Sequence, residues 1–150
     1  MAGRGYNPLM LDDKAAFKRI LPHRQPMLML TSVIQQAEKS IHCTSVIAPE
    51  NPLLLNNCFP VAAGLELLAQ ASGIMLGGQE TGEEPRVGVI ARIKSLQFVG
   101  MTIPVGAELH IHARFLGGNM DAAMIEGDVI MKNQTFCSGT LMLATLPDLF

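Results

Sequence analysis

The sequence predicts an α+β fold in which a curved, mostly antiparallel sheet of about six strands wraps around one long central helix. Three features lead to this expectation: a strongly apolar helical segment in mid-chain, extended segments on both sides of it, and turn residues between those segments. A doubly wound fold would need alternating strands and helices, and a β-sandwich would not place one apolar helix in mid-chain. The 150 residues fit one ordinary domain, so we expect a single domain over residues 1–150.

The N-terminal part predicts a short helix followed by a hairpin. Residues 11–21 have acidic side chains first and basic ones last, which suits the dipole of a short helix, and Pro22 ends it. The segments 27–36 and 40–49 flank the turn sequence "AEK" and predict two antiparallel strands.

The central helix is expected at about residues 60–76. It begins at Pro60 and ends before two glycines, and it is apolar nearly all round, so protein should surround it. Three extended segments follow, at 86–98, 107–118 and 121–146, and the last of them breaks at "KNQT" into two strands.

Composition limits the function further. Hydrophobic residues make up 49% of the chain and charged residues 16%, which predicts an oligomer interface or an apolar tunnel. A net charge of −2 does not indicate nucleic-acid binding. No apolar run is long enough for a membrane span and no secretory signal is visible, so we expect a cytoplasmic protein. Cys43, Cys58 and Cys137 show no CxxC spacing and are expected to be reduced, structural thiols.

Glu66 is the conspicuous residue, because a carboxylate flanked by Leu65, Leu67 and Leu68 is costly to bury unless it is hydrogen-bonded or neutral. Its surroundings resemble a known family. The chain is similar, over about residues 18–146, to the hotdog-fold 3-hydroxyacyl-(acyl carrier protein) dehydratases of fatty-acid synthesis. The matching residues are Leu21, Pro22, His23, Arg24 and Pro26 ahead of the first strand, Pro60, Glu66, Ala69, Gln70, Ala71 and Gly73 on the helix, and the segment "IPVGAELHIHA" at 103–113.

The resemblance implies a β-elimination in which a histidine removes the proton α to a thioester and a helix acid protonates the departing 3-hydroxyl. Glu66 would be that acid, and its apolar environment is expected to raise its pKa so that it stays protonated near pH 7. Amides of the first helical turn would hold the thioester carbonyl. The expected substrate-binding residues are Cys58, Phe59, Pro60, Val61, Ala62, Ala63 and Gln70.

The family's histidine is absent. Counting back from Glu66 places it at Pro52, or at Cys58 if "CFP" is aligned with His-Phe-Pro, and no histidine occurs between His42 and His110. The stretch 51–73, together with "EPRVGVIA", is similar to the histidine-lacking partner subunits of aryl-polyene clusters. This narrower resemblance implies a heterodimer in which a histidine-bearing hotdog subunit supplies the base.

Other candidate residues leave two interpretations each. His23 is either a replacement base or a residue with a tunnel or structural role, whose side chain bonds the backbone at the turn into the first strand. Cys58 is either a nucleophile, although no cation or base lies near it in sequence, or a small apolar residue before the helix. His110 and His112 share one strand face, and a solvated outer face accounts for them more simply than a metal site. A cluster of basic residues in the N-terminal part could bind an acidic carrier protein or a coenzyme A phosphate, or could simply be solvated. The cluster comprises Lys14, Lys18, Arg19 and Arg24.

Three functions therefore remain open. The first is a dehydratase-like protein acting on acyl-ACP or acyl-CoA, as a homodimer or as half of a heterodimer, with Glu66 and His23 as candidate catalytic residues and no cofactor or metal. The second is a hotdog thioesterase in which Glu66 activates water. The third is a non-catalytic acyl-binding subunit.

Overall fold

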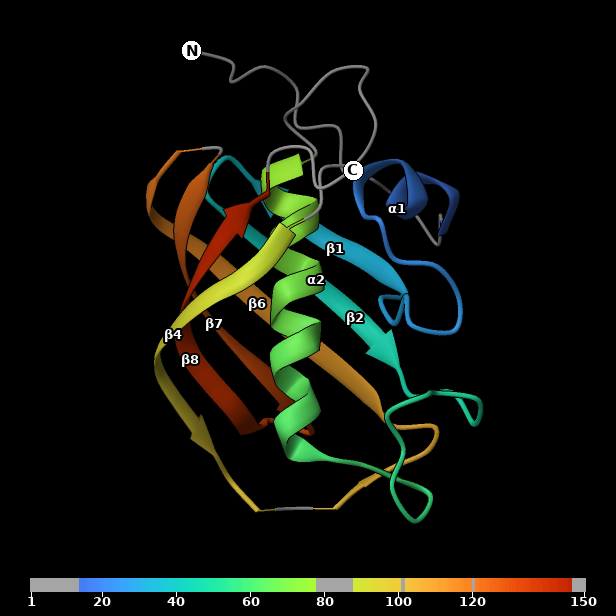
Figure 1. Ribbon diagram of the computed structural model, residues 1–150. Helices are drawn as coiled ribbons and strands as arrows, with labels where there is room; N and C mark the ends of the chain where they lie inside the picture. Colours follow the sequence, from blue (N-terminus) through green and yellow to red (C-terminus); the bar gives the residue numbers. More distant parts are fainter. Residues whose placement is uncertain (1–13, 78–87, 101, 120, 147–150) are drawn as a thin grey trace.

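The computed structural model describes residues 14–77, 88–100, 102–119 and 121–146. A six-stranded antiparallel sheet, in the order β1-β2-β6-β7-β8-β4, curls around helix α2 (Figure 1). The elements in chain order are α1 (Lys14–Ile20), β1 (Ser32–Ala37), β2 (Ser40–Val46), β3 (Cys58–Phe59), the 3-10 turn η1 (Val61–Ala63), α2 (Gly64–Gly77), β4 (Gly88–Phe98), β5 (Ile103–Pro104), β6 (Glu108–Gly118), β7 (Ala122–Met131) and β8 (Gln134–Thr145).

The predicted α+β architecture is confirmed, with differences at the element ends. Helix α1 covers only part of 11–21, whose first residues lie outside the described part of the chain. Strand β1 begins at Ser32, five residues after the expected start at Met27. The two-stranded sheet of β3 and β5 was not predicted, because strands of two residues leave no alternating pattern to read.

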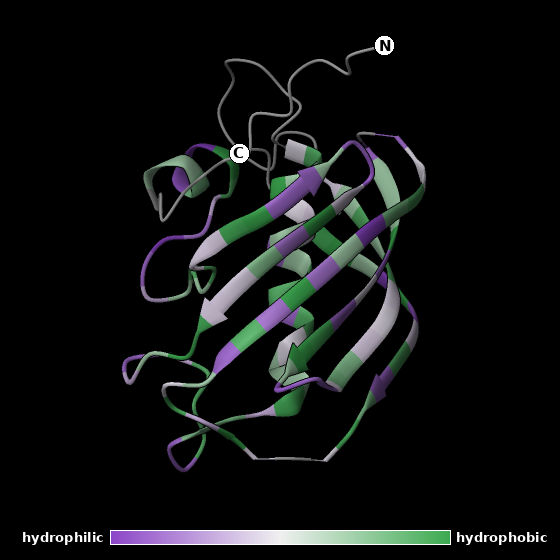
Figure 2. Ribbon diagram, turned by 180° about the vertical axis from the view of Figure 1, so that it is seen from behind, coloured by the Kyte–Doolittle hydropathy of each residue, from purple (hydrophilic) through white to green (hydrophobic). Residues whose placement is uncertain are grey.

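Helix α2 is the centre of the core. Leu67, Leu68, Ala71, Ile74 and Met75 are at most 1% exposed, and they pack against the inner face of the sheet. Each large aliphatic side chain so buried contributes about 1.5–3 kcal/mol. Figure 2 shows hydrophobic and hydrophilic residues alternating along the strands, as expected of strands with one face on the helix and one face outward. No helix in the described residues is long and apolar enough to span a membrane.

Helix α1 is held against the end of α2 at two glycines. A Cβ atom at Gly73 would lie 2.5 Å from Cδ2 of Leu21, and one at Gly77 would lie 2.7 Å from Cγ2 of Ile20. Glycine at these positions therefore permits an approach that alanine would obstruct. This close packing lies directly before the loop that carries His23.

Candidate functional site

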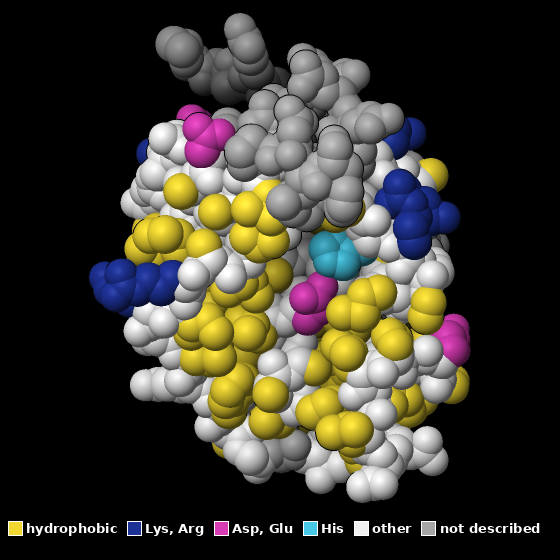
Figure 3. Space-filling model, viewed as in Figure 1, with side chains coloured by type: hydrophobic (Ala, Val, Ile, Leu, Met, Phe, Trp, Pro, Cys, Tyr) yellow, Lys and Arg dark blue, Asp and Glu magenta, His cyan; other side chains and the backbone are white. Residues whose placement is uncertain are grey.

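Glu66 lies near the start of α2, on the side of the helix that the sheet does not cover. Its side chain is 26% exposed. Figure 3 shows, on this face, an acidic side chain directly beside a histidine, with hydrophobic side chains on both sides of the pair. The pair therefore forms a polar centre within an apolar surface.

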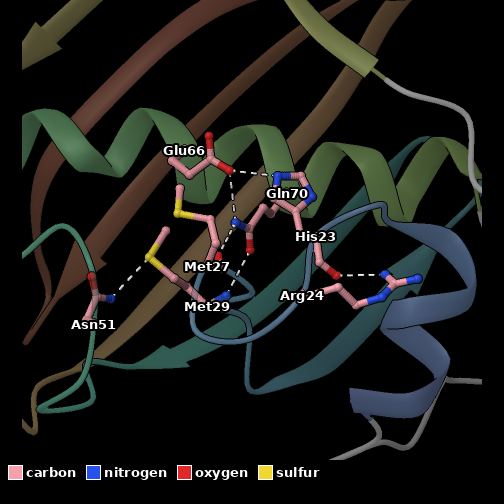
Figure 4. A network of polar contacts seen from close by, with 7 residues as sticks. All are labelled: His23, Arg24, Met27, Met29, Asn51, Glu66 and Gln70. Carbon is pink, nitrogen blue, oxygen red and sulfur yellow. Dashed lines mark hydrogen bonds and ion pairs between the residues drawn. The ribbon is translucent and has the colours of Figure 1, made fainter. Parts of the chain in front are cut away.

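One oxygen of the Glu66 carboxylate accepts two hydrogen bonds. His23 Nε2 and Gln70 Nε2 each lie 2.9 Å from Glu66 Oε1 (Figure 4). The second carboxylate oxygen is directed away from both donors (Figure 4). Two fixed donors on Oε1 thus orient the carboxyl group and leave its other oxygen for a ligand.

Gln70 ties the loop to the helix. Its side chain is fully buried, and Nε2 also donates to the carbonyl of Met27 at 2.8 Å, while Oε1 accepts the amide of Met29 at 3.0 Å. All the polar atoms of this buried amide therefore have partners, as burial demands. The spacing of four residues between Glu66 and Gln70 places both on one helix face.

His23 contacts Glu66 and not the backbone at its turn, so that part of the structural interpretation is wrong. Its Nδ1 atom is buried without a hydrogen-bond partner. In the neutral form of the ring we therefore assign the proton to Nε2, because a buried N–H at Nδ1 would be unsatisfied. With Nε2 bound to Glu66 and Nδ1 enclosed by protein, His23 has no nitrogen left to face a substrate.

The pKa of Glu66 is lowered, and the expectation of a raised value is wrong. Burial is the largest single effect and raises the pKa, but the hydrogen bonds from His23 and Gln70, together with the charge of His23, outweigh it. The apolar neighbours of Glu66 predict its burial, and Gln70 one turn later is a possible donor, but the sequence pattern does not reveal the donor from His23. In this chain by itself, Glu66 is therefore predominantly a carboxylate at neutral pH.

The segment that leads into α2 contains the other expected substrate-binding residues. Phe59 is 1% exposed and packs in the core, so its side chain faces the interior and not a ligand, whereas Cys58 and Pro60 are half-buried. Val61 to Ala63 form the turn η1, in which the Ala63 amide already bonds the Pro60 carbonyl at 2.9 Å. The amides of Val61 and Ala62 remain as candidates to hold a carbonyl.

The expected positions of the family histidine lie in a loop that turns sharply. Asn56 and Asn57 both adopt positive φ, at 51° and 60°, and Leu55 and Cys58 exchange two backbone hydrogen bonds across them. Such a tight turn suits asparagine, which tolerates the left-handed region. Pro52 is exposed at the start of this loop. The loop contains no imidazole that could act as a base.

His110 and His112 lie on the outer face of the sheet, as the simpler interpretation expected, and there they meet a third histidine. His42 Nε2 is 2.9 Å from His110 Nδ1, and His112 Nδ1 is 3.0 Å from Asp128 Oδ1. Burial, then His112 and His110, lower the pKa of His42, and Asp128 opposes them. Within the described ranges no group of three His, Cys, Asp or Glu side chains could hold a metal ion.

This histidine group was missed because His42 is 68 residues from His110 in sequence. The antiparallel register of β2 and β6, which pairs His42 with His112, is the signal that would have revealed it. Among the basic residues, Lys18, Arg19 and Arg24 are exposed. Arg24 also donates to the carbonyls of Leu21 and His23, at 3.0 and 2.8 Å, which stiffens the loop that carries His23.

Comparisons of the sequence with known proteins agree with one another. The family described as "ApeP-like: ApeP dehydratase" matches residues 15–149. The 3-hydroxyacyl-[acyl-carrier-protein] dehydratase FabZ of Colwellia psychrerythraea is 28% identical over 142 residues, which cover 90% of this chain and 94% of that protein. FabZ of Streptococcus gordonii is 28% identical over 137 residues, covering 88% and 96%.

Solved structures share the fold. A chain of the dehydratase heterocomplex ApeI:P from Xenorhabdus doucetiae superposes with a TM-score of 0.79 at 22% identity, covering 88% of this chain and 91% of that one. A hypothetical thioesterase with coenzyme A from Streptococcus pneumoniae gives a TM-score of 0.59 at 12% identity, covering 78% and 86%. At these identities the structural likeness establishes the hotdog fold.

Proposed function

This chain belongs to the ApeP-like dehydratase family, and on that premise we propose that it is the acid-bearing half of a heterodimeric 3-hydroxyacyl-thioester dehydratase. The observation that carries the proposal is the Glu66 carboxyl, which two donors hold by one oxygen while the other oxygen is directed away from both donors. A histidine-bearing hotdog subunit would complete the site. The similarity to the ApeI:P heterocomplex and to FabZ supports this assignment.

The proposed reaction is an elimination of water. The partner's histidine removes the proton α to the thioester, the Cα–Cβ double bond forms, and the bond from Cβ to the hydroxyl oxygen breaks as Glu66 protonates that oxygen. The amides of Val61 and Ala62 stabilise the charge that develops on the thioester carbonyl. The proton acquired by the partner's histidine and the one lost by Glu66 are exchanged with solvent after water leaves.

Glu66 must carry a proton for this step. The productive state has that proton on the second oxygen, while Oε1 still accepts the two N–H groups from His23 and Gln70. Burial raises the pKa of Glu66, so covering the site with a partner and an acyl chain increases the protonated fraction. The substrate would be a 3-hydroxyacyl group on acyl carrier protein or coenzyme A, and the reaction would take place in the cytoplasm.

Co-expression with a histidine-bearing dehydratase-like subunit of the same genome tests the proposal. We expect dehydration of a 3-hydroxyacyl thioester by the complex and none by the chain alone. Glu66→Gln keeps the side-chain length and should abolish turnover in the complex, whereas Glu50→Gln, at an exposed position, should leave it unchanged. A Glu66→Gln complex with the wild-type rate would overturn the proposal.

One observation favours the thioesterase alternative. A carboxylate that is ionised at neutral pH can accept a proton from water, whereas the dehydratase reaction needs Glu66 in its protonated form. The same samples discriminate between the two reactions, because hydrolysis releases a free thiol and elimination does not. Glu66-dependent thiol release by the chain alone would establish the thioesterase, and tight acyl-thioester binding without either reaction would indicate a non-catalytic subunit.

A further inference from the structure

Strand β4 lies at the margin of the six-stranded sheet, and within the described part of the chain it pairs with β8 alone (Figure 1). It is eleven residues long, yet none of its residues is buried, whereas every other strand of that sheet has at least one buried residue. Its outer edge presents unpaired backbone groups, which form a template for another strand. Apolar side chains at this edge are also exposed: Ile93 is 45%, Phe98 41% and Val99 46% accessible.

The charge on this edge has one sign. Arg92 and Lys94 are both exposed, and neither forms an ion pair within the described residues. Neither β4 nor the adjacent β8 contains an acidic residue. The nearest acids by strand order are on β7, where Glu126 is bound to Arg114 at 2.7 Å and Asp128 to His112 at 3.0 Å. Among the described residues, the charged side chains of β4 and β8 are therefore all basic.

Pairing of β4 with a second copy of itself would bring these charges together. Antiparallel pairing centred on Ile93 brings Arg92 of each copy next to Lys94 of the other, on a strand that bulges between Ile90 and Arg92 and between Ile93 and Ser95. Residues directly opposite one another across an antiparallel pair have Cβ atoms about 4.5–5.5 Å apart, and like charges there are destabilising. Four cations would meet in this arrangement, and neither β4 nor β8 carries an acidic residue to offset them.

We propose that Arg92 and Lys94 make β4 select a partner edge strand that carries carboxylates, and that they disfavour pairing with a second copy of this chain. This inference rests on the proposed function, because the site needs a base from another subunit. Exposed apolar residues supply attraction to any partner strand, and the basic pair determines which partner fits. The specificity of the heterodimer is then encoded at the strand edge.

A mixing experiment with this chain alone tests the proposal. The double variant Arg92→Glu/Lys94→Glu has the opposite charge on its edge and should also pair poorly with itself. An equimolar mixture of wild type and this variant has complementary edges. By sedimentation at low salt we expect the mixture to associate at least about tenfold more tightly than either protein alone, and the difference to shrink as salt screens the charges.

The matched control is Lys18→Glu/Arg19→Glu, which makes the same charge change on exposed residues of α1. Mixed with wild type, it should not reproduce the effect. Arg92→Gln/Lys94→Gln removes the repulsion without adding charge, so this variant should self-associate more tightly than wild type. It tests the proposal even if the charge-reversed variant does not fold. A wild-type homodimer as tight as the complementary mixture, or an equal gain with the α1 control, would refute the proposal.

The experiment is independent of catalysis. It needs no substrate, and Glu66→Gln in both proteins should leave the association unchanged. If the mixture behaves as expected while Glu66→Gln complexes remain active, only the proposed function fails. If the mixture shows no preference while Glu66→Gln abolishes dehydration, only the edge proposal fails.

Discussion

His23 Nε2 lies 2.9 Å from Glu66 Oε1, and this contact joins the loop after α1 to the one acidic residue of α2. It gives Glu66 a donor from another segment, beyond the one that its own helix supplies through Gln70. The contact also determines which role His23 can play. Since its second nitrogen is enclosed by protein, any influence of His23 on a ligand would pass through the carboxyl group that it contacts.

The first prediction concerns that coupling. His23→Leu removes the donor and leaves the burial, so the pKa of Glu66 should rise, because the remaining largest effect favours the neutral acid. His23→Gln places an amide donor near the position of Nε2 and should keep part of the lowering. Titration of the Glu66 side-chain carboxyl carbon by NMR measures both.

His110→Gln is the control for this series, because His110 lies on the outer sheet face and contacts Glu108 and His42 instead. It should not move the Glu66 titration. An unchanged Glu66 titration in His23→Leu would show that Gln70 alone lowers the pKa. If His23 had only a structural role, His23→Leu and His23→Gln would both be less stable than wild type, but Glu66 would titrate alike in the two variants.

The second prediction follows from the sign of the same shift. A carboxyl group whose folded-state pKa is lowered contributes stability above its unfolded-state pKa, here the ordinary value of 4.5, and loses that contribution as pH falls through the folded-state pKa. The difference in unfolding free energy between wild type and Glu66→Gln should therefore be constant near neutral pH and shrink below about pH 4.5. Urea unfolding across this range measures it. A difference that grows on acidification would mean that the folded-state pKa is raised.

The sequence predicted the fold well because long elements leave a strong periodic signal. The apolar run from Pro60, the hairpin around "AEK" and the break at "KNQT" appear in the structure as η1 with α2, β1 with β2, and the turn at Lys132–Asn133. Helix ends were less accurate: the first turn is a 3-10 turn over Val61–Ala63, and the expected start at Pro60 is its N-cap. Local hydrogen bonding decides such details, and a hydrophobic pattern does not report it.

The site was predicted only in part, because its energetics depend on contacts between distant segments. The position of Glu66 followed from the helix pattern and the family resemblance. Its pKa depends on His23, which lies 43 positions earlier in the chain, and on a buried amide that also bonds Met27 and Met29. The histidine group around His42 needs the register of β2 against β6. Sequence spacing alone contains neither relationship.

The third prediction concerns Gln70. Gln70→Leu keeps the volume of this buried side chain but leaves the Met29 amide and the Met27 carbonyl without their partners, and each unsatisfied buried group costs about 1–3 kcal/mol. We expect a large fall in unfolding free energy, measured by urea, and a rise in the Glu66 pKa. Gln35→Leu, at an exposed position on β1, should change stability little. Equal effects of the two substitutions would contradict the network described here.

The fourth prediction distinguishes the three cysteines. Burial raises the pKa of Cys43 to about 12, and burial together with Asp128 raises the pKa of Cys137 to about 11, so both thiols are protonated and enclosed at pH 8. Cys58 is half-buried at the start of the segment that leads into α2. Iodoacetamide should therefore label Cys58 first in the native protein, and Cys43 and Cys137 only after unfolding. Peptide mass spectrometry gives the order.

The same labelling reports on acyl binding. Cys58 was one of the expected substrate-binding residues, and its strand continues through Pro60 into the amides proposed to hold a thioester carbonyl. A saturating acyl-pantetheine thioester should slow the alkylation of Cys58, whereas pantetheine without an acyl chain should not. Denatured protein provides the control, because all three thiols then react without protection. Unchanged alkylation in the presence of a thioester that demonstrably binds would place the acyl chain away from β3 and remove Cys58 from the site.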